Sequence, residues 1–308
     1  MKIFVTGATG FIGSAIIQEL INEGYQVLGL ARSDAGARSL IAAGAEVHRG
    51  DLEDLDSLRS GAAAADGAIH TAFIHDFSKF KENCEIDRRA IEALGSALAG
   101  SDRLLIVTSG TGMAGPTPGR LSTEDDPPYS GPGSIPRIAS EEAAASIAGR
   151  GVRVSVVRLP QVHDPEKQGL VTYAIAVARE KGISIFVGDG ANCWPAVHRL
   201  EAAHLYRLVL EKGVAGARYH AVAEEGVPFR EIAQAIGRHV NVPVVSKSPE
   251  EGGEHFGWLA HFTAMDSPAS IERTRKLLRW QPRQTGLIAD LDAAQYFEPK
   301  TDRAVAAR

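Results

Sequence analysis

Three glycines near the start of the chain constrain its fold more than any other feature. The apolar run at residues 1–5 is followed by Gly7, Gly10 and Gly13, and then by residues 14–20, whose apolar positions have helical spacing. A strand, a glycine-rich turn and a helix in this order are typical of the βαβ unit that binds a dinucleotide. The glycines allow a tight bend, a close approach of backbone N–H groups to the diphosphate, and close packing of helix against strand. The diphosphate then lies at a helix N-terminus, where unpaired N–H groups and the helix dipole favour negative charge.

The spacing of these glycines resembles that of one protein family. They are each three residues apart and follow Thr6, as in the extended short-chain dehydrogenase/reductases and the NAD-dependent epimerase/dehydratase group. Three other motifs are similar to those of the family: His70-Thr71-Ala72 and Arg158-Leu159-Pro160, each at the end of a predicted strand, and Trp280-Gln281-Pro282 near the C-terminus. The resemblance covers about the whole chain. It is specific for the fold and the cofactor, and much less so for the reaction.

The resemblance implies a set of residues that contact a nicotinamide dinucleotide. They lie in the glycine loop and at the carboxyl ends of the predicted strands, where open α/β sheets bind their ligands: Thr6, Gly7, Thr9, Gly10, Phe11, Ile12, Gly13, Arg32, Ser33, Asp51, Leu52, Thr71, Ala72, Pro160, Val162 and His163. Asp51 has two interpretations, because the family places an Asp here against the adenine ring, whereas an acidic run is also typical of a turn or a helix cap. His163 is expected to form a wall of the nicotinamide pocket.

Predicted strands and helices alternate along the chain, and this alternation is typical of parallel strand pairing. The strands are predicted at residues 2–6, 25–30, 45–48, 67–71, 103–108, 152–158 and 217–222. The helices are predicted at residues 11–23, 34–43, 53–60, 83–99, 139–149, 167–181, 199–212 and 229–239. We therefore expect an α/β fold: a Rossmann-type doubly wound parallel sheet at residues 1–160, and a smaller C-terminal α/β substrate-binding lobe at residues 161–308. Some segments of this lobe are expected to return to the sheet, and the substrate is expected in the cleft between the two parts.

The composition of the chain argues against several classes of binding partner. Lys and Arg number 33 against 38 Asp and Glu, giving a net charge of −5, and there is no basic stripe of the kind that binds nucleic acid. No apolar run approaches the roughly 18 residues of a membrane span, and the N-terminus lacks the pattern of a signal peptide. The two cysteines, Cys84 and Cys193, are too few for a disulfide framework and lack metal-ligand spacing. We expect a cytoplasmic protein with a small-molecule substrate and without a bound metal; a homodimer is implied by the family alone.

Two segments are predicted to lack regular structure. Residues 111–136 form a long loop rich in Gly, Pro and acidic residues that leaves the carboxyl end of the fifth predicted strand. Ligands bind at this edge of an open sheet, so the loop is expected to border the substrate site. Residues 299–308 show no periodicity and are expected to be a frayed tail.

The end of the second predicted strand distinguishes NADP from NAD. A carboxylate at this point binds the ribose 2′-OH of NAD, whereas the 2′-phosphate of NADP requires cations and hydroxyl groups. Here Arg32 and Ser33 fill the decisive positions and Asp34 follows them. An Arg can bind a phosphate with two N–H donors, so NADP(H) is favoured and NAD(H) remains possible. Alternatively, Arg32 is an ordinary solvated residue and Asp34 caps the next helix.

The catalytic pattern of the family is not matched. Typical members carry a Tyr that transfers a proton and, one helical turn later, a Lys that lowers the pKa of the Tyr. When the chain is aligned on Ser140, the Tyr position is Arg137 and the Lys position is Glu141. Neither residue can take the usual role, because Arg stays protonated and Glu would repel a phenolate. The two residues are expected to form an exposed i,i+4 ion pair; alternatively, Arg137 binds an anionic substrate or the nicotinamide ribose.

Replacement groups must come from other positions. The family holds the substrate oxygen with a hydroxyl just after the fifth strand, and here the matching position is Gly110, with Ser109 and Thr111 on either side. These hydroxyls either bind the substrate or bond the local backbone. Tyr129, in the long loop, and His75, after the fourth strand, are the preferred proton donors. His163 and His198 also follow predicted strands, and any of these His residues is alternatively structural.

Two functions from different classes are compatible with this pattern. The first is an NADP(H)-dependent reductase of a small carbonyl compound or an activated alkene, in which the cofactor supplies the hydride. The second is a non-catalytic NADP(H)-binding sensor or regulatory protein, which the missing Tyr and Lys favour. A sugar-nucleotide epimerase or dehydratase is a further alternative, although its chemistry depends more strongly on the missing pair.

Overall fold

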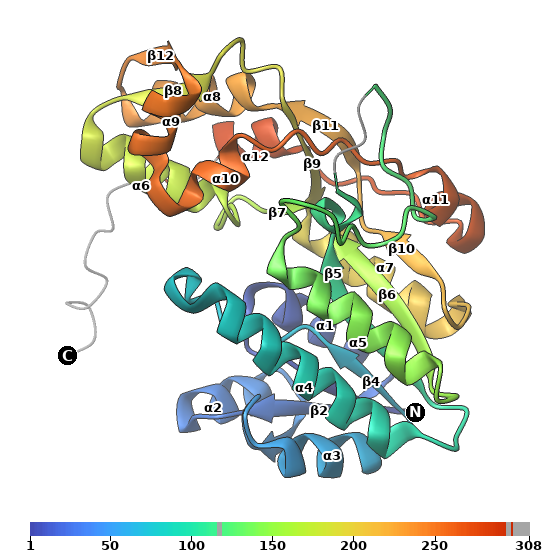
Figure 1. The fold of residues 1–308 in the computed structure, drawn as a ribbon. Coiled ribbons are helices and arrows are strands. Elements are labelled where there is room, and N and C mark those ends of the chain that lie inside the picture. Colours follow the sequence, from blue (N-terminus) through green and yellow to red (C-terminus); the bar gives the residue numbers. More distant parts are fainter. Residues whose placement is uncertain (116–118, 294–296, 298–308) are drawn as a thin grey trace, which may run out of the picture.

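The computed structural model describes residues 1–115, 119–293 and 297. Its centre is a seven-stranded parallel sheet (Figure 1). In spatial order the strands are β10 (Arg218–His220), β6 (Arg153–Leu159), β5 (Leu104–Gly110), β4 (Gly67–His70), β1 (Lys2–Thr6), β2 (Gln26–Ala31) and β3 (Glu46–Arg49). The order reverses between β1 and β4, which makes the sheet doubly wound.

Helices cover both faces of the sheet because its strands are apolar on both sides. Ile3 and Val5 of β1 pack into one hydrophobic cluster and Phe4 packs into another, as the alternation of side chains along a strand requires. The first cluster lies under α1 (Phe11–Asn22), α2 (Asp34–Ala42) and α7 (Arg199–Lys212). The second lies under α3 (Leu55–Ala63), α4 (Phe80–Leu98) and α5 (Ala139–Ala148).

The C-terminal half adds a second group of elements beside the carboxyl end of the sheet (Figure 1). A three-stranded sheet has the order β11 (Glu224–Pro228), β9 (Cys193–His198) and β7 (Gln161–His163), and a two-stranded sheet pairs β12 (Val244–Lys247) with β8 (Ser184–Val187). A third hydrophobic cluster forms among β8, β9 and β11 and the helices α6 (Val171–Lys181), α8 (Phe229–Val240), α9 (Pro249–Phe256), α10 (Ala260–Thr263) and α12 (Leu287–Asp292). The helix α11 (Glu272–Leu278) instead packs against α7 and β10, so this part of the chain returns to the central sheet.

The predicted fold class is confirmed. All seven predicted strands of the central sheet are present within two residues at each end. The eight predicted helices are also present, although α4 begins three residues earlier than predicted and α6 begins at Val171 rather than at residue 167. The sequence did not predict β7, β8, β9, β11 or β12, which are short, nor the helices α9 to α12.

Among residues 1–115, 119–293 and 297, no helix is long and apolar enough to cross a membrane. The same residues contain no cluster of three or more His, Cys, Asp or Glu that is arranged to hold a metal ion. The expected tail at residues 299–308 lies outside the part of the chain that the structure describes.

Candidate functional site

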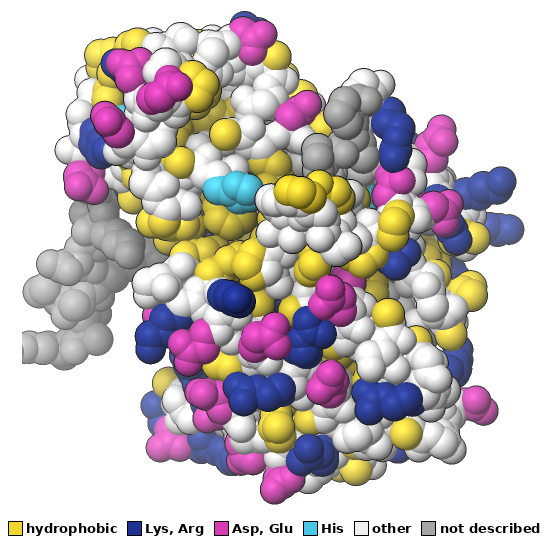
Figure 2. All heavy atoms as spheres, in the orientation of Figure 1, with side chains coloured by type: hydrophobic (Ala, Val, Ile, Leu, Met, Phe, Trp, Pro, Cys, Tyr) yellow, Lys and Arg dark blue, Asp and Glu magenta, His cyan; other side chains and the backbone are white. Residues whose placement is uncertain are grey.

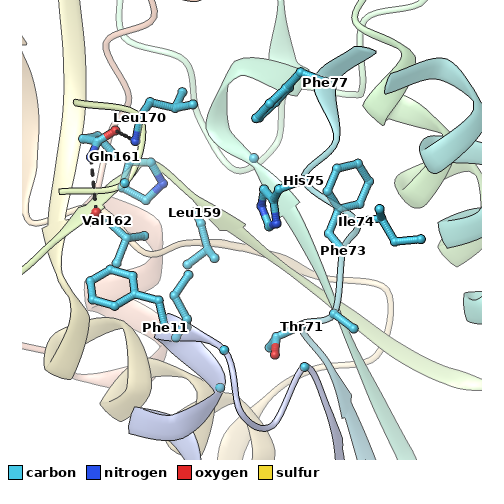
Figure 3. A pocket seen from close by; sticks show the side chains of 18 of the residues that line it. Phe11, Thr71, Phe73, Ile74, His75, Phe77, Leu159, Gln161, Val162 and Leu170 are labelled. Atoms are coloured by element: carbon cyan, nitrogen blue, oxygen red, sulfur yellow. Dashed lines mark hydrogen bonds between the residues drawn. The ribbon is translucent and has the colours of Figure 1, made fainter. Parts of the chain in front are cut away.

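A cavity of about 880 Å³ lies between the carboxyl edge of the central sheet and the C-terminal elements. Its walls come from the glycine loop after β1 and from the ends of β2, β4, β5 and β6, together with β7, α6 and residues 262–267. Figure 3 shows the residues after β4, from Thr71 to Phe77, facing Phe11, Leu159, Val162 and Leu170 across this space. Concave sites of this volume at the switch point of a doubly wound sheet are the usual ligand sites of α/β proteins.

The glycine loop at one end of the cavity has the geometry of an anion cradle. Gly7 has a φ of +67°, and a methyl group on Gly13 would lie 2.1 Å from the carbonyl oxygen of Gly7. Helix α1 therefore passes so close to the turn that only glycine fits at residue 13. Gly10 is the N-cap of α1 and offers no side-chain hydrogen bond to the first turn. The N–H groups of that turn thus face the cavity without a capping side chain, which suits the diphosphate of a dinucleotide.

Most of the residues that the sequence assigned to the cofactor line this cavity: Gly7, Thr9, Gly10, Phe11, Ile12, Gly13, Arg32, Asp51, Leu52, Thr71, Ala72, Pro160 and Val162. Thr6, Ser33 and His163 do not line it. The Thr6 hydroxyl is buried against the imidazole of His70, and the Ser33 hydroxyl caps α2 by accepting the N–H of Gly36. His163 is buried, with its Nδ1 2.7 Å from a carboxylate oxygen of Asp290.

The end of β2 carries the residues that would distinguish NADP from NAD. Arg32 lines the cavity and forms no ion pair with any residue that the structure describes. The Asp34 carboxylate is paired with Arg49 at the end of β3. The alternative role of Asp34 as a helix cap is wrong, because the cap of α2 is Ser33.

Asp51 forms a turn. Its carboxylate accepts hydrogen bonds from the backbone N–H groups of Glu53 and Asp54, at 2.8 and 3.1 Å. Asp54, three residues later, is the N-cap of α3 and accepts the N–H of Ser57. The turn-forming role that the sequence predicted for Asp51 is therefore confirmed, and Asp51 lines the cavity as well.

The two hydroxyls at the end of β5 have different surroundings. The Ser109 hydroxyl donates to the Glu141 carboxylate at 2.7 Å, within the protein and outside the cavity lining. Thr111 lies at the start of the short 3-10 helix η2 (Thr111–Ala114) and lines the cavity, and its hydroxyl forms no hydrogen bond with another described residue. Of the two candidates for binding a substrate oxygen, only Thr111 is thus within reach of the cavity.

Arg137 and Glu141 do not pair with each other, so the predicted i,i+4 ion pair is wrong. Arg137 is paired with the buried carboxylate of Asp87 on α4. Glu141 accepts hydrogen bonds from Arg158 at 2.7 and 2.8 Å, and a third from Arg218 at 3.0 Å. The sequence prediction failed because each residue pairs with a fully buried side chain of another element, Arg137 with Asp87 and Glu141 with Arg158.

A chain of buried polar side chains extends inward from Arg137. His70 lies between Thr6 and Asp87, 2.8 Å from the Thr6 hydroxyl and 3.1 Å from the Asp87 carboxylate. Asp87 also accepts the hydroxyl of Ser140 at 2.7 Å. Burial by itself raises the pKa of the Asp87 carboxyl, but Arg137, His70 and Ser140 outweigh burial and hold this pKa at about 2. Asp87 is thus ionised at neutral pH and neutralises Arg137.

The two predicted proton donors lie in different places. His75 lines the cavity, and Figure 3 shows its imidazole between Phe73 and Phe77. His75 as a whole is exposed to solvent, but partial burial of its ring, together with the positive charges of Arg137 and Lys167, lowers its pKa below the ordinary value. Tyr129 does not line the cavity; its ring packs against Gly115 and Gly131, and its hydroxyl donates to the carbonyl of Pro132.

The long loop borders the cavity in part, through Thr111 to Met113 and Ile135, while residues 116–118 lie outside the described part of the chain. His198 has a structural role, since its Nδ1 accepts the N–H of Leu200 and caps α7.

Several lining residues had not been identified from the sequence. They lie on segments that only the fold brings together: Phe73, Phe77, Lys167, Tyr173, Phe262 and Met265. Most are apolar, and an apolar side chain on a helix or strand is more often a core residue than a site residue. The sequence contains no periodicity or spacing that separates these residues from the rest of the core.

Comparisons with known proteins agree with this geometry. Residues 3–223 match the family model described as the NAD dependent epimerase/dehydratase family. An uncharacterized protein of Schizosaccharomyces pombe is 48% identical over 96% of this chain and 100% of its own length, and another from Saccharomyces cerevisiae is 45% identical over 95% of this chain and 98% of its own length. The solved structure of the UDP-glucose 4-epimerase of Thermus thermophilus in complex with NAD has a similar fold, with a TM-score of 0.75 and 20% identity over 96% of this chain and 99% of that one. The chain therefore belongs to the NAD dependent epimerase/dehydratase family.

Proposed function

We propose that the protein is an NADP(H)-dependent reductase of a small, largely apolar carbonyl compound or activated alkene. The observation that carries this proposal is a single cavity that joins the glycine cradle to an apolar end. Phe73, Phe77, Tyr173, Phe262 and Met265 line this end, whereas a sugar nucleotide would require many hydrogen-bonding groups. A dinucleotide bound at the cradle would leave this end of the cavity for the substrate.

The preference for NADP(H) is supported by the residues after β2. Arg32 has no ion-pair partner among the described residues, so its guanidinium is available to a 2′-phosphate. The carboxylate of Asp34, which would repel a phosphate, is paired with Arg49. The Ser33 hydroxyl uses its oxygen to cap α2 and keeps its hydrogen for a further acceptor.

Thr111 and His75 are the groups that we assign to the substrate oxygen. The bound cofactor would supply a hydride to the carbonyl carbon, and the oxygen would then require a proton. The Thr111 hydroxyl, which has no other partner among described residues, would donate a hydrogen bond to that oxygen. His75, flanked by aromatic rings at the same cavity, would supply the proton.

One observation favours a second candidate, a non-catalytic NADP(H)-binding protein. Arg137 and Glu141 stand where the family carries its Tyr and Lys, and each is held in an ion pair with a buried partner. Neither side chain lines the cavity, so neither would transfer a proton to a ligand there.

Binding and turnover together test these proposals. The purified protein is titrated with NADPH and NADH, and the loss of NADPH absorbance is followed with a panel of ketones, aldehydes and enones. We expect NADPH to bind about 10- to 100-fold more tightly than NADH, because one charge-assisted hydrogen-bonding group contributes a free energy of this size. We also expect NADPH to be consumed with at least one substrate of the panel. Binding without turnover across the panel would favour the non-catalytic protein. Interconversion of UDP-sugars without net NADPH consumption would overturn the reductase proposal.

A further inference from the structure

The end of the cavity farthest from the glycine cradle has aromatic walls. Phe73 and Phe77 come from the segment after β4, Tyr173 from α6 and Phe262 from α10. Figure 2 shows apolar side chains gathered where the N-terminal end of α4 faces the C-terminal elements. Rings from three separate segments of the chain therefore meet at one site.

The ring of Phe77 is fixed from behind by Trp258. The two ring centroids are 4.3 Å apart and the planes differ by only 16°, so the rings are stacked face to face. Tyr173 and Phe262 meet the Phe77 ring edge-on, with centroids at 6.1 and 5.9 Å. Trp258 does not line the cavity, whereas Phe77, Tyr173 and Phe262 do. Trp258 is itself half-exposed, so its stacking and the two edge contacts restrict the Phe77 ring, and Phe77 lines the cavity.

The ring of Phe73 is fixed in a corresponding way by Arg137. The guanidinium carbon lies 4.0 Å from the centroid of the Phe73 ring, at the distance of a cation–π contact. Arg137 is itself fixed by the Asp87 carboxylate, and it does not line the cavity. Both phenyl rings of the segment after β4 are therefore supported from outside, and both line the cavity.

A polar group lies between the two supported rings. The imidazole of His75 has its centroid 5.3 Å from that of Phe73 and 6.2 Å from that of Phe77, and it meets both rings at steep angles. Figure 3 shows these three side chains on the same wall, facing Leu159 and Leu170. A ligand at this wall thus meets flat apolar surface with one hydrogen-bonding group in the middle.

We infer that this end of the cavity binds a flat aromatic or conjugated ring that carries the reducible carbonyl group directly on it. Preorganised rings favour a flat partner, because aromatic rings attract one another through offset-stacked and edge-to-face contacts that a puckered ring makes less well. Phe73 and Phe77 supply these contacts, and Arg137 and Trp258 are positioning residues that act through them. The inference rests on the proposed reductase function and names its substrate class.

A pair of matched ketones tests the inference. Acetophenone and cyclohexyl methyl ketone have the same carbon skeleton and differ in whether the ring is flat. Binding of each to the protein saturated with NADP⁺, which has no hydride to give to a ketone, is measured by calorimetry, and turnover with NADPH is measured separately. We expect acetophenone to bind about 3- to 10-fold more tightly, which corresponds to one or two aromatic contacts.

Two variants and a control locate the effect. Phe77→Leu and Trp258→Leu should each weaken acetophenone binding severalfold and leave cyclohexyl methyl ketone and NADPH binding within about twofold, so the ratio between the ketones falls towards one. Tyr25→Leu removes an aromatic ring outside the cavity and should change neither ketone, and circular dichroism checks that all three variants fold. Equal binding of the two ketones, or a ratio that both variants leave unchanged, would overturn the inference even if turnover is observed. Selective binding of acetophenone without turnover would support the ring site and overturn the reductase function.

Discussion

Glu141 binds the guanidinium of Arg158 through both of its carboxylate oxygens, and at most 1% of either side chain is exposed. The pair joins α5 to β6 beneath the carboxyl edge of the sheet, and Ser109 and Arg218 donate further hydrogen bonds to the same carboxylate. Burial raises the pKa of Glu141, but Arg158, Ser109 and Arg218 outweigh burial and keep the pKa below its ordinary value. Glu141 is therefore a buried, ionised residue that anchors α5 to β6, which means that its carboxylate holds the two elements together through Arg158.

Restoring the family Lys at this position should unfold the protein rather than activate it. Glu141→Lys would place a third cation beside Arg158 and Arg218 in a buried site, and we expect a loss of at least about 3–5 kcal/mol in the free energy of unfolding. Urea denaturation measures this loss. The double variant Glu141→Leu with Arg158→Met should recover most of it, because a buried ion pair can be replaced by apolar groups at little cost. If Glu141→Lys were as stable as the wild type, the anchor role would be wrong.

The low pKa of Asp87 predicts how the free energy of unfolding changes at acidic pH. Its folded-state pKa of about 2 lies below the value near 3.9 of an unfolded Asp, so the carboxylate stabilises the fold fully above about pH 4. This contribution, on the order of 2 kcal/mol, should be lost as the pH falls from about 4 to 2. Asp87→Asn should be less stable at neutral pH and should lack this part of the acid decline. Urea denaturation at several pH values gives both quantities, and parallel declines in the two proteins would contradict the assignment.

Arg32 should determine the preference for NADP(H). Arg32→Ala removes the cation that the 2′-phosphate would contact, so we expect NADPH binding to weaken about 10- to 100-fold while NADH binding stays within about twofold. Fluorescence titration measures both constants. Arg38→Ala, on the exposed side of α2 and outside the cavity lining, is the matched control. Equal weakening of both dinucleotides would instead indicate a general role for Arg32 in the cavity.

The strands of the central sheet could be predicted because each is marked by residues that are neighbours in the sequence. Among β1 to β6, all but β3 are short, mainly apolar runs, and the glycine loop identifies the first crossover. The strands β7, β8, β9 and β11 have only three to six residues, and β11 contains two Glu residues and a Gly. β8, β9 and β11 contribute to the third hydrophobic cluster, and β7 pairs with β9 while Val162 packs into the first cluster. These contacts join segments that are distant in the sequence, so no local sequence pattern predicts them.

The candidate site likewise has one part that the sequence predicted and another part that it did not. The glycine loop and Arg32 were identified because their chemistry requires particular residue types at particular positions in the sequence. The partners of Arg137 and Glu141 could not be identified, because Asp87 and Arg158 lie 50 and 17 residues away along the chain. The packing of α4 against the 3-10 helix Pro136–Ile138, and of α5 against β6, decides those pairs. An i,i+4 spacing shows only that two residues share a helix face.

The third glycine of the loop should tolerate no side chain. Gly13→Ala adds a methyl group 2.1 Å from the backbone oxygen of Gly7, and backbone on both sides leaves little room to move. We expect the loop to shift and NADPH binding to weaken at least about 100-fold, because the close approach to the diphosphate is lost. Gly253→Ala is a suitable control, since Gly253 is also in a helix but a methyl group there meets nothing within 4 Å. This control should gain about 0.5–1 kcal/mol in the free energy of unfolding and bind NADPH normally.

His75 should determine the pH dependence of ketone reduction. Burial, Arg137 and Lys167 lower the pKa of His75, so its protonated form grows only as the pH falls below the ordinary value near 6.5. If His75 supplies the proton, kcat/KM should rise as the pH falls through this range and level off below the pKa. His75→Gln should remove the rise and lower kcat at least about 100-fold, as for a general acid, whereas His204→Gln, outside the cavity, should leave the profile unchanged. Lys167→Met removes a positive charge that lowers the His75 pKa, so the rise should move to higher pH. A profile that neither His75→Gln nor Lys167→Met alters would assign the proton to another group.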